Sequence, residues 1–223
     1  MSVNHQSPDD AREATRDAMV IALDRLREDG SGGLSLDVEL SSSFVSEALA
    51  KTDARADQAG RLDAHIWLQA DGTVLVRGRL HATFAVPCAR CLADAMVDAG
   101  ADLCVTFVPR GEFDAQLARR AGDSDDGVEL DADDLDQFPY EGTSVDLSPL
   151  IREQIHLAYP MRALCGYGEA CRGLCPACGA NLNEGPVQDH CPKCHAALGS
   201  ASAESEEPPP AWKAALEKLR GNN

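Results

Sequence analysis

Aromatic residues and long apolar runs are scarce in this sequence. Phe, Trp and Tyr make up 4% of the 223 residues, so the core is expected to be aliphatic. No apolar run approaches the roughly 18 residues that a membrane helix needs. The first residues, MSVNHQSPDD, have neither the basic start nor the apolar segment of a secretory signal. We therefore expect a cytoplasmic protein.

Basic charge and catalytic motifs are also in short supply. The chain carries 37 Asp and Glu against 20 Lys and Arg, a formal net charge of -17 at pH 7. Such a surface repels phosphate and favours basic partners. The sequence contains no phosphate-binding glycine loop, no nucleophile-elbow serine and no H-E-x-x-H motif. We expect a protein that is not an enzyme, with no small-molecule substrate and no membrane partner.

Cysteine, by contrast, is abundant and clustered. Six of the nine cysteines fall between Cys165 and Cys194. They include two C-x-x-C pairs, Cys175/Cys178 and Cys191/Cys194, and Gly179 supplies a permissive backbone after the first pair. Four thiolates in this spacing are typical of a closed, structural zinc site. In a reducing cytosol we expect metal ligands rather than disulfides, and the prediction is a zinc ribbon with one Zn²⁺.

Four further cysteines form a second candidate metal site: Cys88, Cys91, Cys165 and Cys171. A site made from these four would join a sheet domain to the start of the ribbon. Two alternatives stay open. Cys165 or Cys171 can replace a ribbon ligand, or Cys88 and Cys91 can act as a redox pair, although their antiparallel context is unlike a thioredoxin site. Cys104 is expected to be an isolated, half-buried thiol.

Hydrophobic periodicity predicts an α+β fold. Residues 34–40, 62–68, 74–86 and 97–107 alternate apolar and polar side chains, and Asp71-Gly72 is a strong hairpin signal. The prediction is an antiparallel, barrel-like β-meander over residues 34–160 with a packed helix over residues 147–159, which Asp146 caps. An acidic stretch near residues 110–141 has no periodicity and is expected to be a disordered insertion.

Smaller segments flank this domain. Residues 1–33 predict either a helix over residues 8–29, with Ser7 as its cap, or a mobile arm. The zinc-ribbon module is assigned to residues 161–199. Residues 200–223 predict a linker and a short amphipathic helix that carries Trp212, Leu216 and Leu219.

Three phrases resemble the YceD family, which is associated with accumulation of large-subunit (23S) rRNA: VPCARCL (Val86–Leu92), DLSPLIREQIHLAYP (Asp146–Pro160) and LCGYGEACRGLCPACGANLNEG (Leu164–Gly185). The resemblance implies a non-enzymatic factor in ribosome biogenesis. It carries the family's cysteines onto Cys88, Cys91, Cys165, Cys171, Cys175 and Cys178. The more complete final pair, Cys191/Cys194, and the N-terminal helix depart from the family pattern.

The acidic charge argues against direct binding to RNA, whereas the family resemblance implies a link to rRNA. We expect contact with RNA to be indirect, or confined to a small patch such as Arg77, Arg79 and Arg90. The partner that suits the charge is a basic ribosomal protein or a pre-large-subunit particle. Two other functions remain open: a zinc-ribbon nucleic-acid-binding or transcription accessory protein, and a redox-switched zinc chaperone.

Overall fold

The computed structural model describes residues 7–28, 33–121 and 136–198. The chain divides into two compact units, Met1–Glu169 and Ala170–Asn223. The predicted amphipathic helix at Trp212 and the middle of the acidic stretch lie outside the described residues. Within the described ranges, no helix has the length and apolar character needed to span a membrane.

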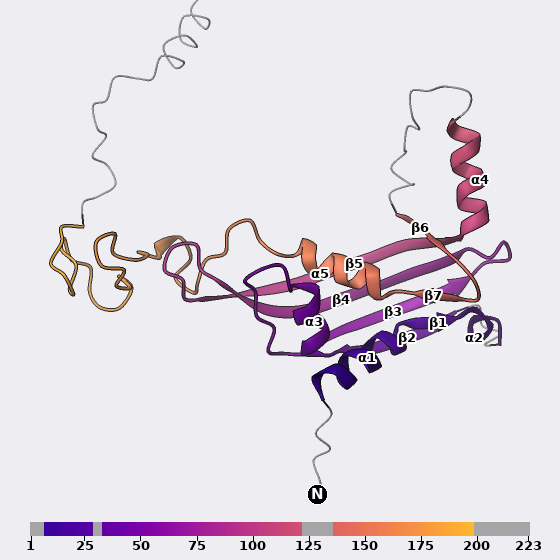
Figure 1. The fold of residues 1–223 in the computed structure, drawn as a ribbon, viewed down its shortest axis with the longest axis horizontal. Coiled ribbons are helices and arrows are strands. Elements are labelled where there is room, and N and C mark those ends of the chain that lie inside the picture. The colour runs from indigo at the N-terminus through magenta and orange to yellow at the C-terminus, as the bar shows by residue number, and fades with distance from the viewer. Residues whose placement is uncertain (1–6, 29–32, 122–135, 199–223) are drawn as a thin grey trace, which may run out of the picture. The chain divides into compact units, whose positions relative to one another are not determined.

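The first unit is an α+β structure built on a mostly antiparallel five-stranded sheet (Figure 1). Its strands are β2 (Leu34–Leu40), β3 (Gly60–Leu68), β4 (Val74–Pro87), β5 (Asp94–Pro109) and β6 (Gln137–Tyr140), in that order across the sheet. The first four form the predicted meander, and β6 joins β5 in parallel. The expected barrel-like closure is wrong, because the strand order ends at β2 on one side and β6 on the other.

Alternation along the strands places one face of the sheet in the core. The inward residues of β3 and β4, such as Leu62, Ile66 and Leu80, are buried, while their neighbours in sequence are exposed. The predicted turn joins these strands: Gly72 has φ +90°, and the Asp71 carboxylate accepts a hydrogen bond from the Thr73 N–H at 2.9 Å. Glycine is needed there because the left-handed conformation disfavours other residues.

Helices α1 (Pro8–Ala18), α3 (Ser42–Ala48) and α5 (Ser148–Leu157) lie over one face of the sheet in Figure 1. Phe44, Ile151 and Ile155 are fully buried in the core that these helices share with the strands. Leu147 is the N-cap of α5, and the Asp146 carboxylate accepts from the Ser148 N–H at 2.8 Å. The predicted packed helix is therefore present and begins one residue later than expected.

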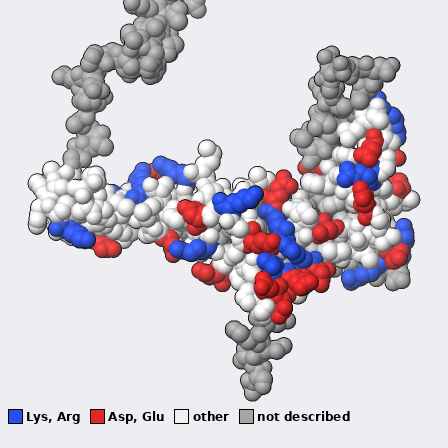
Figure 2. Space-filling view, in the orientation of Figure 1, with Lys and Arg blue, Asp and Glu red and all other residues white. Residues whose placement is uncertain are grey.

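An ion-pair cluster also ties the three helices together. Glu47 on α3 accepts a hydrogen bond from Arg16 of α1 at 2.6 Å, and Arg152 of α5 lies 3.6 Å from the same carboxylate. The Arg152 guanidinium lies 5.3 Å from the centroid of the Phe44 ring, within cation–π range. Figure 2 shows acidic and basic side chains intermingled on this side of the unit.

The N-terminal prediction needs a correction. Ser7 caps α1 as expected, accepting from the Asp10 N–H, but the helix ends at Ala18. A short strand, β1 (Val20–Ala22), then pairs with β7 (Ser144–Asp146), and α2 (Leu23–Glu28) follows. Pairing buries Ile21, and β-branched residues fit a strand better than a helix. The segment is docked rather than a mobile arm.

The acidic insertion is also partly ordered, contrary to prediction. Helix α4 (Arg110–Ala121) follows β5 directly, with Phe113 and Leu117 half-buried one turn apart. Strand β6 brings Phe138 against Phe107 with ring centroids 5.6 Å apart, and Tyr140 donates to the Gly72 carbonyl at 2.6 Å. The sequence does not predict this order, because acidic residues outnumber the few large apolar residues of the stretch.

Replacing Ile151 tests the packing of α5. Ile151 is fully buried, so Ile151→Ala is expected to lower the free energy of unfolding by about 2–5 kcal/mol, because it removes buried methyl groups and leaves a cavity. Leu157→Ala on the same helix, where Leu157 is 67% exposed, should change it by about 0.5 kcal/mol or less. Urea unfolding monitored by circular dichroism measures both. Equal effects of the two substitutions would contradict this packing.

Candidate metal centres

The three C-x-x-C pairs adopt one backbone geometry, here called the knuckle turn. In each turn the first cysteine's N–H donates to the carbonyl five residues ahead, and its carbonyl accepts from the N–H four residues ahead. The first bond is 2.8 Å in Cys88→Ala93, Cys175→Ala180 and Cys191→Ala196. The second is 2.8–3.0 Å from Leu92, Gly179 and His195. These two bonds fold each pair back on itself.

The residue after the second cysteine takes the left-handed conformation in all three turns. Its φ is +61° at Leu92, +70° at Gly179 and +58° at His195. Among the described residues, Leu92 and His195 are the non-glycine residues with positive φ. The sequence indicates this feature only at Gly179, because leucine and histidine give no sign that they occupy such a position.

Two knuckle turns form the C-terminal group of Cys175, Cys178, Cys191 and Cys194, whose sulfur atoms lie within 4.8 Å of one another. The Sγ–Sγ distance is 3.7 Å for Cys175–Cys194 and for Cys178–Cys191. A disulfide bond is about 2.05 Å long, whereas sulfurs in a tetrahedral four-thiolate metal site lie about 3.8 Å apart. These thiols are free, and their spacing fits a metal ion.

The second unit has little else to hold it together. Its buried residues, within the part that the structure describes, are Cys171, Gly173, Cys175 and Cys191. Its described strand pairing consists of the isolated bridges Leu174–Asn181 and His190–Ala197. Cys178 and Cys194, the second cysteines of the two knuckle turns in this unit, are by contrast exposed. A unit whose buried side chains are thiols depends on whatever those thiols bind.

The other candidate cysteines also come together. The Ala89 N–H donates to the Ala163 carbonyl at 2.9 Å, which places Cys91 Sγ 3.6 Å from Cys165 Sγ. Cys88, Cys91, Cys165 and Cys171 are all buried, and their four sulfurs lie within 4.8 Å of one another. Either set can bind a metal ion, so the chain has two candidate metal centres.

The backbone favours the thiolate form of Cys88. Burial raises the pKa of this thiol, but the backbone N–H groups of Arg90, Cys91 and Cys165 and the Cys91 thiol outweigh burial, so the pKa falls to about 6. The Arg90 N–H lies 3.5 Å from Cys88 Sγ. A lowered pKa prepares a ligand for a cation, since the thiolate is the form that binds metals.

Protons are unequally shared in the C-terminal group. The backbone N–H of Cys194 lowers the pKa of Cys191; burial raises it, but the Lys193 N–H and two neighbouring thiols lower it further, to about 6. The Ala180 N–H lowers the pKa of Cys178, but burial and the other three thiols raise it to about 12. Four thiols this close cannot all ionise without a cation between them.

Asn183 is a supporting residue that sequence analysis missed. Its side-chain amide donates to Cys171 Sγ at 3.3 Å and to Asn181 Oδ1 at 2.9 Å, and its Oδ1 accepts from the Arg172 N–H at 2.8 Å. Hydrogen bonds of this kind orient metal ligands. The only signal in the sequence was the N-L-N phrase that follows the first ribbon cysteines.

The remaining predicted residues lie apart from both groups. Cys104 is exposed on β5, facing Arg77 across the strand pair. Arg79 is paired with Asp102 at 2.9 Å, and Arg90 with Glu169 at 2.8 Å. The expected basic patch of Arg77, Arg79 and Arg90 is therefore largely neutralised by neighbouring carboxylates.

Comparison with known families supports the resemblance seen in the cysteine phrases. The model of the family "Large ribosomal RNA subunit accumulation protein YceD" matches residues 76–220, more than half of the chain. The chain belongs to the YceD family. The match covers all eight candidate metal ligands, β4 from residue 76 onward, β5, and the first knuckle turn between these strands.

Two curated YceD relatives match over a shorter stretch. Both are named "Large ribosomal RNA subunit accumulation protein YCED homolog 1, chloroplastic". The Zea mays protein is 42% identical over 59 residues, which is 26% of this chain and 20% of the relative. The Arabidopsis thaliana protein is 42% identical over 55 residues, 25% of this chain and 16% of the relative. The chain thus spans a fifth or less of either relative. No solved structure matches it significantly.

Metal content tests the two centres separately. We expect purified protein to carry one metal ion in each cysteine group. Cys178→Ser and Cys91→Ser should each remove one ion, because each breaks one four-thiolate set, and Cys104→Ser should remove none. Plasma mass spectrometry against protein concentration gives the count. Loss of both ions from either single variant would contradict independent centres.

Two glycines offer a matched test of the knuckle turn. A Cβ on Gly179 or on Gly100 would meet nothing within 4 Å, so space does not distinguish the two positions, but only Gly179 has positive φ. Gly179→Ala is expected to weaken metal retention about fivefold through the cost of the left-handed conformation, and Gly100→Ala should leave retention unchanged. Chelator competition measures it. Equal retention in both variants would show that the conformation is unimportant.

Proposed function

We propose that this chain is a non-enzymatic factor in large ribosomal subunit biogenesis that supports synthesis, processing or accumulation of 23S rRNA. The observation that carries the proposal is membership of the YceD family, which is named for accumulation of the large ribosomal RNA. Both candidate centres support a structural role, since four thiolates leave no open coordination position for a substrate.

In this proposal the metal is zinc. Sulfur-only ligand sets suit Zn²⁺, and the sulfur spacing fits its tetrahedral geometry. Cys175, Cys178, Cys191 and Cys194 hold one ion in a zinc ribbon, and Cys88, Cys91, Cys165 and Cys171 hold a second. The metals stabilise the fold; they do not take part in a reaction.

The proposed partner is a basic ribosomal protein, free or in a pre-large-subunit particle. Three features support it: the net charge of -17, the ion pairing of Arg79 and Arg90, and the formal neutrality of residues 170–198, where Arg172 and Lys193 balance Glu184 and Asp189. An acidic or neutral surface does not attract a phosphate backbone. Contact with rRNA is then mainly indirect.

The ratio of large-subunit to small-subunit rRNA in cells lacking the gene tests this function. We expect the ratio to fall and to be restored by the wild-type gene and by Cys104→Ser, which changes a cysteine outside both groups. Cys175→Ser/Cys178→Ser should fail to restore it, because the ribbon cannot hold its metal. An unchanged ratio in the deleted strain would overturn the proposal, provided that growth and total RNA are matched.

A further inference from the structure

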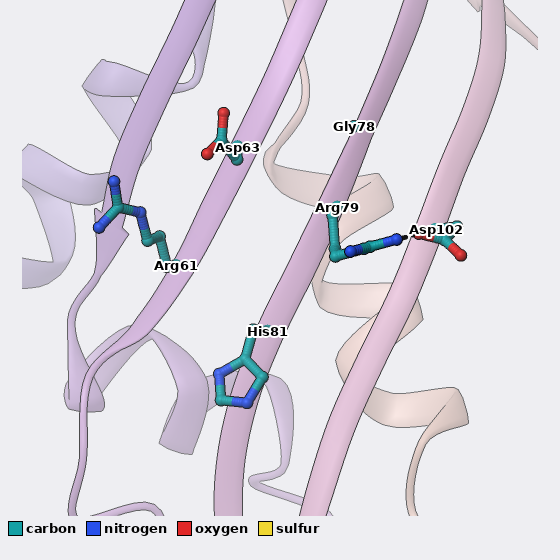
Figure 3. Close-up of a pocket in the computed structure, with 6 residues that line it drawn as sticks. All are labelled: Arg61, Asp63, Gly78, Arg79, His81 and Asp102. Carbon is teal, nitrogen blue, oxygen red and sulfur yellow. Dashed lines mark hydrogen bonds and ion pairs between the residues drawn. The ribbon is translucent and has the colours of Figure 1, made fainter.

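None of the residues that the structure describes covers the second face of the five-stranded sheet. The helices that share the core lie on the opposite face, and the outward side chains of β2 to β5 are mainly exposed. Figure 3 views this surface, with Arg61, Arg79, His81 and Asp102 standing toward the viewer and helices behind the strands. We call these outward positions on β2–β5 the outer face.

Carboxylates outnumber guanidinium groups on the outer face. Its carboxylates are Asp37, Glu39, Asp63, Asp94, Asp98 and Asp102, and its guanidinium groups are Arg61, Arg77 and Arg79. Five of the six carboxylates lie on β2 and β5, and Asp63 lies on β3, whereas the arginines lie on β3 and β4. Six negative charges exceed the three arginines and Arg55, which is bonded to Asp94 beside the face, so this face stays negative after internal pairing.

Ion pairs involve two of the three arginines and four of the six carboxylates, because Arg55 beside the face is bonded to Asp94. Arg61 is bonded to Asp37, Arg79 Nε lies 2.9 Å from Asp102 Oδ1, and His81 Nε2 lies 3.1 Å from Asp98 Oδ1. A carboxylate has about four acceptor sites and a guanidinium about five N–H donors. Six carboxylates therefore offer more acceptors than three arginines can fill, and a phosphate would meet a carboxylate beside each paired arginine.

Two adjoining hollows give this surface relief. One, of about 450 Å³, is lined by Arg61, Asp63, Gly78, Arg79, His81 and Asp102. The other, of about 600 Å³, is lined by Asp37, Glu39, Ala59, Gly60, Arg61 and His81, so the two share Arg61 and His81. Gly100 adds an opening between Asp98 and Asp102, since nothing lies within 4 Å of where its Cβ would be.

We propose that the outer face is the docking surface for a lysine- and arginine-rich protein segment. The inference rests on the proposed function and deepens it, because it assigns the basic partner to one surface of the first unit. Cationic side chains enter the two hollows and add donors to Asp102 and Glu39 there, and to Asp98 next to His81 at their border. RNA is the alternative occupant, and the charge of the face disfavours it.

Fluorescence anisotropy of a labelled arginine-rich peptide with the full chain tests the surface. Asp98→Asn/Asp102→Asn is expected to weaken binding about fivefold by removing two negative charges from the face. The matched control is Asp9→Asn/Asp24→Asn, which removes two exposed, arginine-paired carboxylates from α1 and α2. It changes the net charge equally and should weaken binding less than about twofold.

Equal weakening in both variants would mean that only net charge attracts the peptide, and would overturn the proposal. So would tighter binding of a single-stranded RNA than of the peptide. A second measurement uses the unmodified protein: the peptide should shift the NMR signals of the His81 ring and the Arg61 and Arg79 Nε–H groups, and shifts confined to other surfaces would overturn the assignment. Peptide binding is independent of the rRNA ratio, so failure here is distinct from failure of the proposed function.

Discussion

The knuckle turn is the constraint on which both candidate metal centres depend. Two sulfurs separated by two residues face the same point only if the chain reverses immediately after the second cysteine, and the left-handed residue makes that reversal. At Leu92 and His195 the protein accepts a side chain in a conformation that costs about 1–2 kcal/mol. Such strain persists where the surroundings over-determine the backbone. The two backbone hydrogen bonds of each turn, and the thiols they bring together, supply that determination.

Local signals made much of the fold predictable. Strands β2 to β5 follow from period-two alternation, and the Asp71-Gly72 hairpin follows from its turn residues. The three C-x-x-C pairs were predictable as metal-ligand candidates because such a pair carries its geometry in its spacing. What these signals share is that each is completed within a few residues, so no partner from elsewhere in the chain is needed to read them.

The elements that were missed depend on distant partners. Val20–Ala22 is a strand because β7, more than a hundred residues later, pairs with it; alone, the segment continues a helical pattern. Phe138 packs against Phe107 of β5, so the end of the acidic stretch becomes a parallel edge strand, and the residues directly after β5 form a helix. The positive φ of Leu92 is likewise set by the turn and not by leucine. The composition of these segments does not predict their secondary structure, because that structure depends on residues elsewhere in the chain.

The two units of this molecule differ in what stabilises their fold. The first unit is stabilised by a large aliphatic core, and its surface ion pairs add little to the free energy of unfolding. These ion pairs mainly determine the distribution of charge on the surface. The described part of the second unit has four buried residues, three of them cysteines, and four charged ones that cancel. Segments of this size seldom fold on apolar burial alone. Under the proposal that Cys175, Cys178, Cys191 and Cys194 bind a metal ion, metal binding and folding of that unit are one equilibrium, and loss of the metal would unfold this unit while leaving the acidic sheet intact. Binding of a partner to the sheet would therefore survive metal depletion, whereas a process that requires the second unit would not.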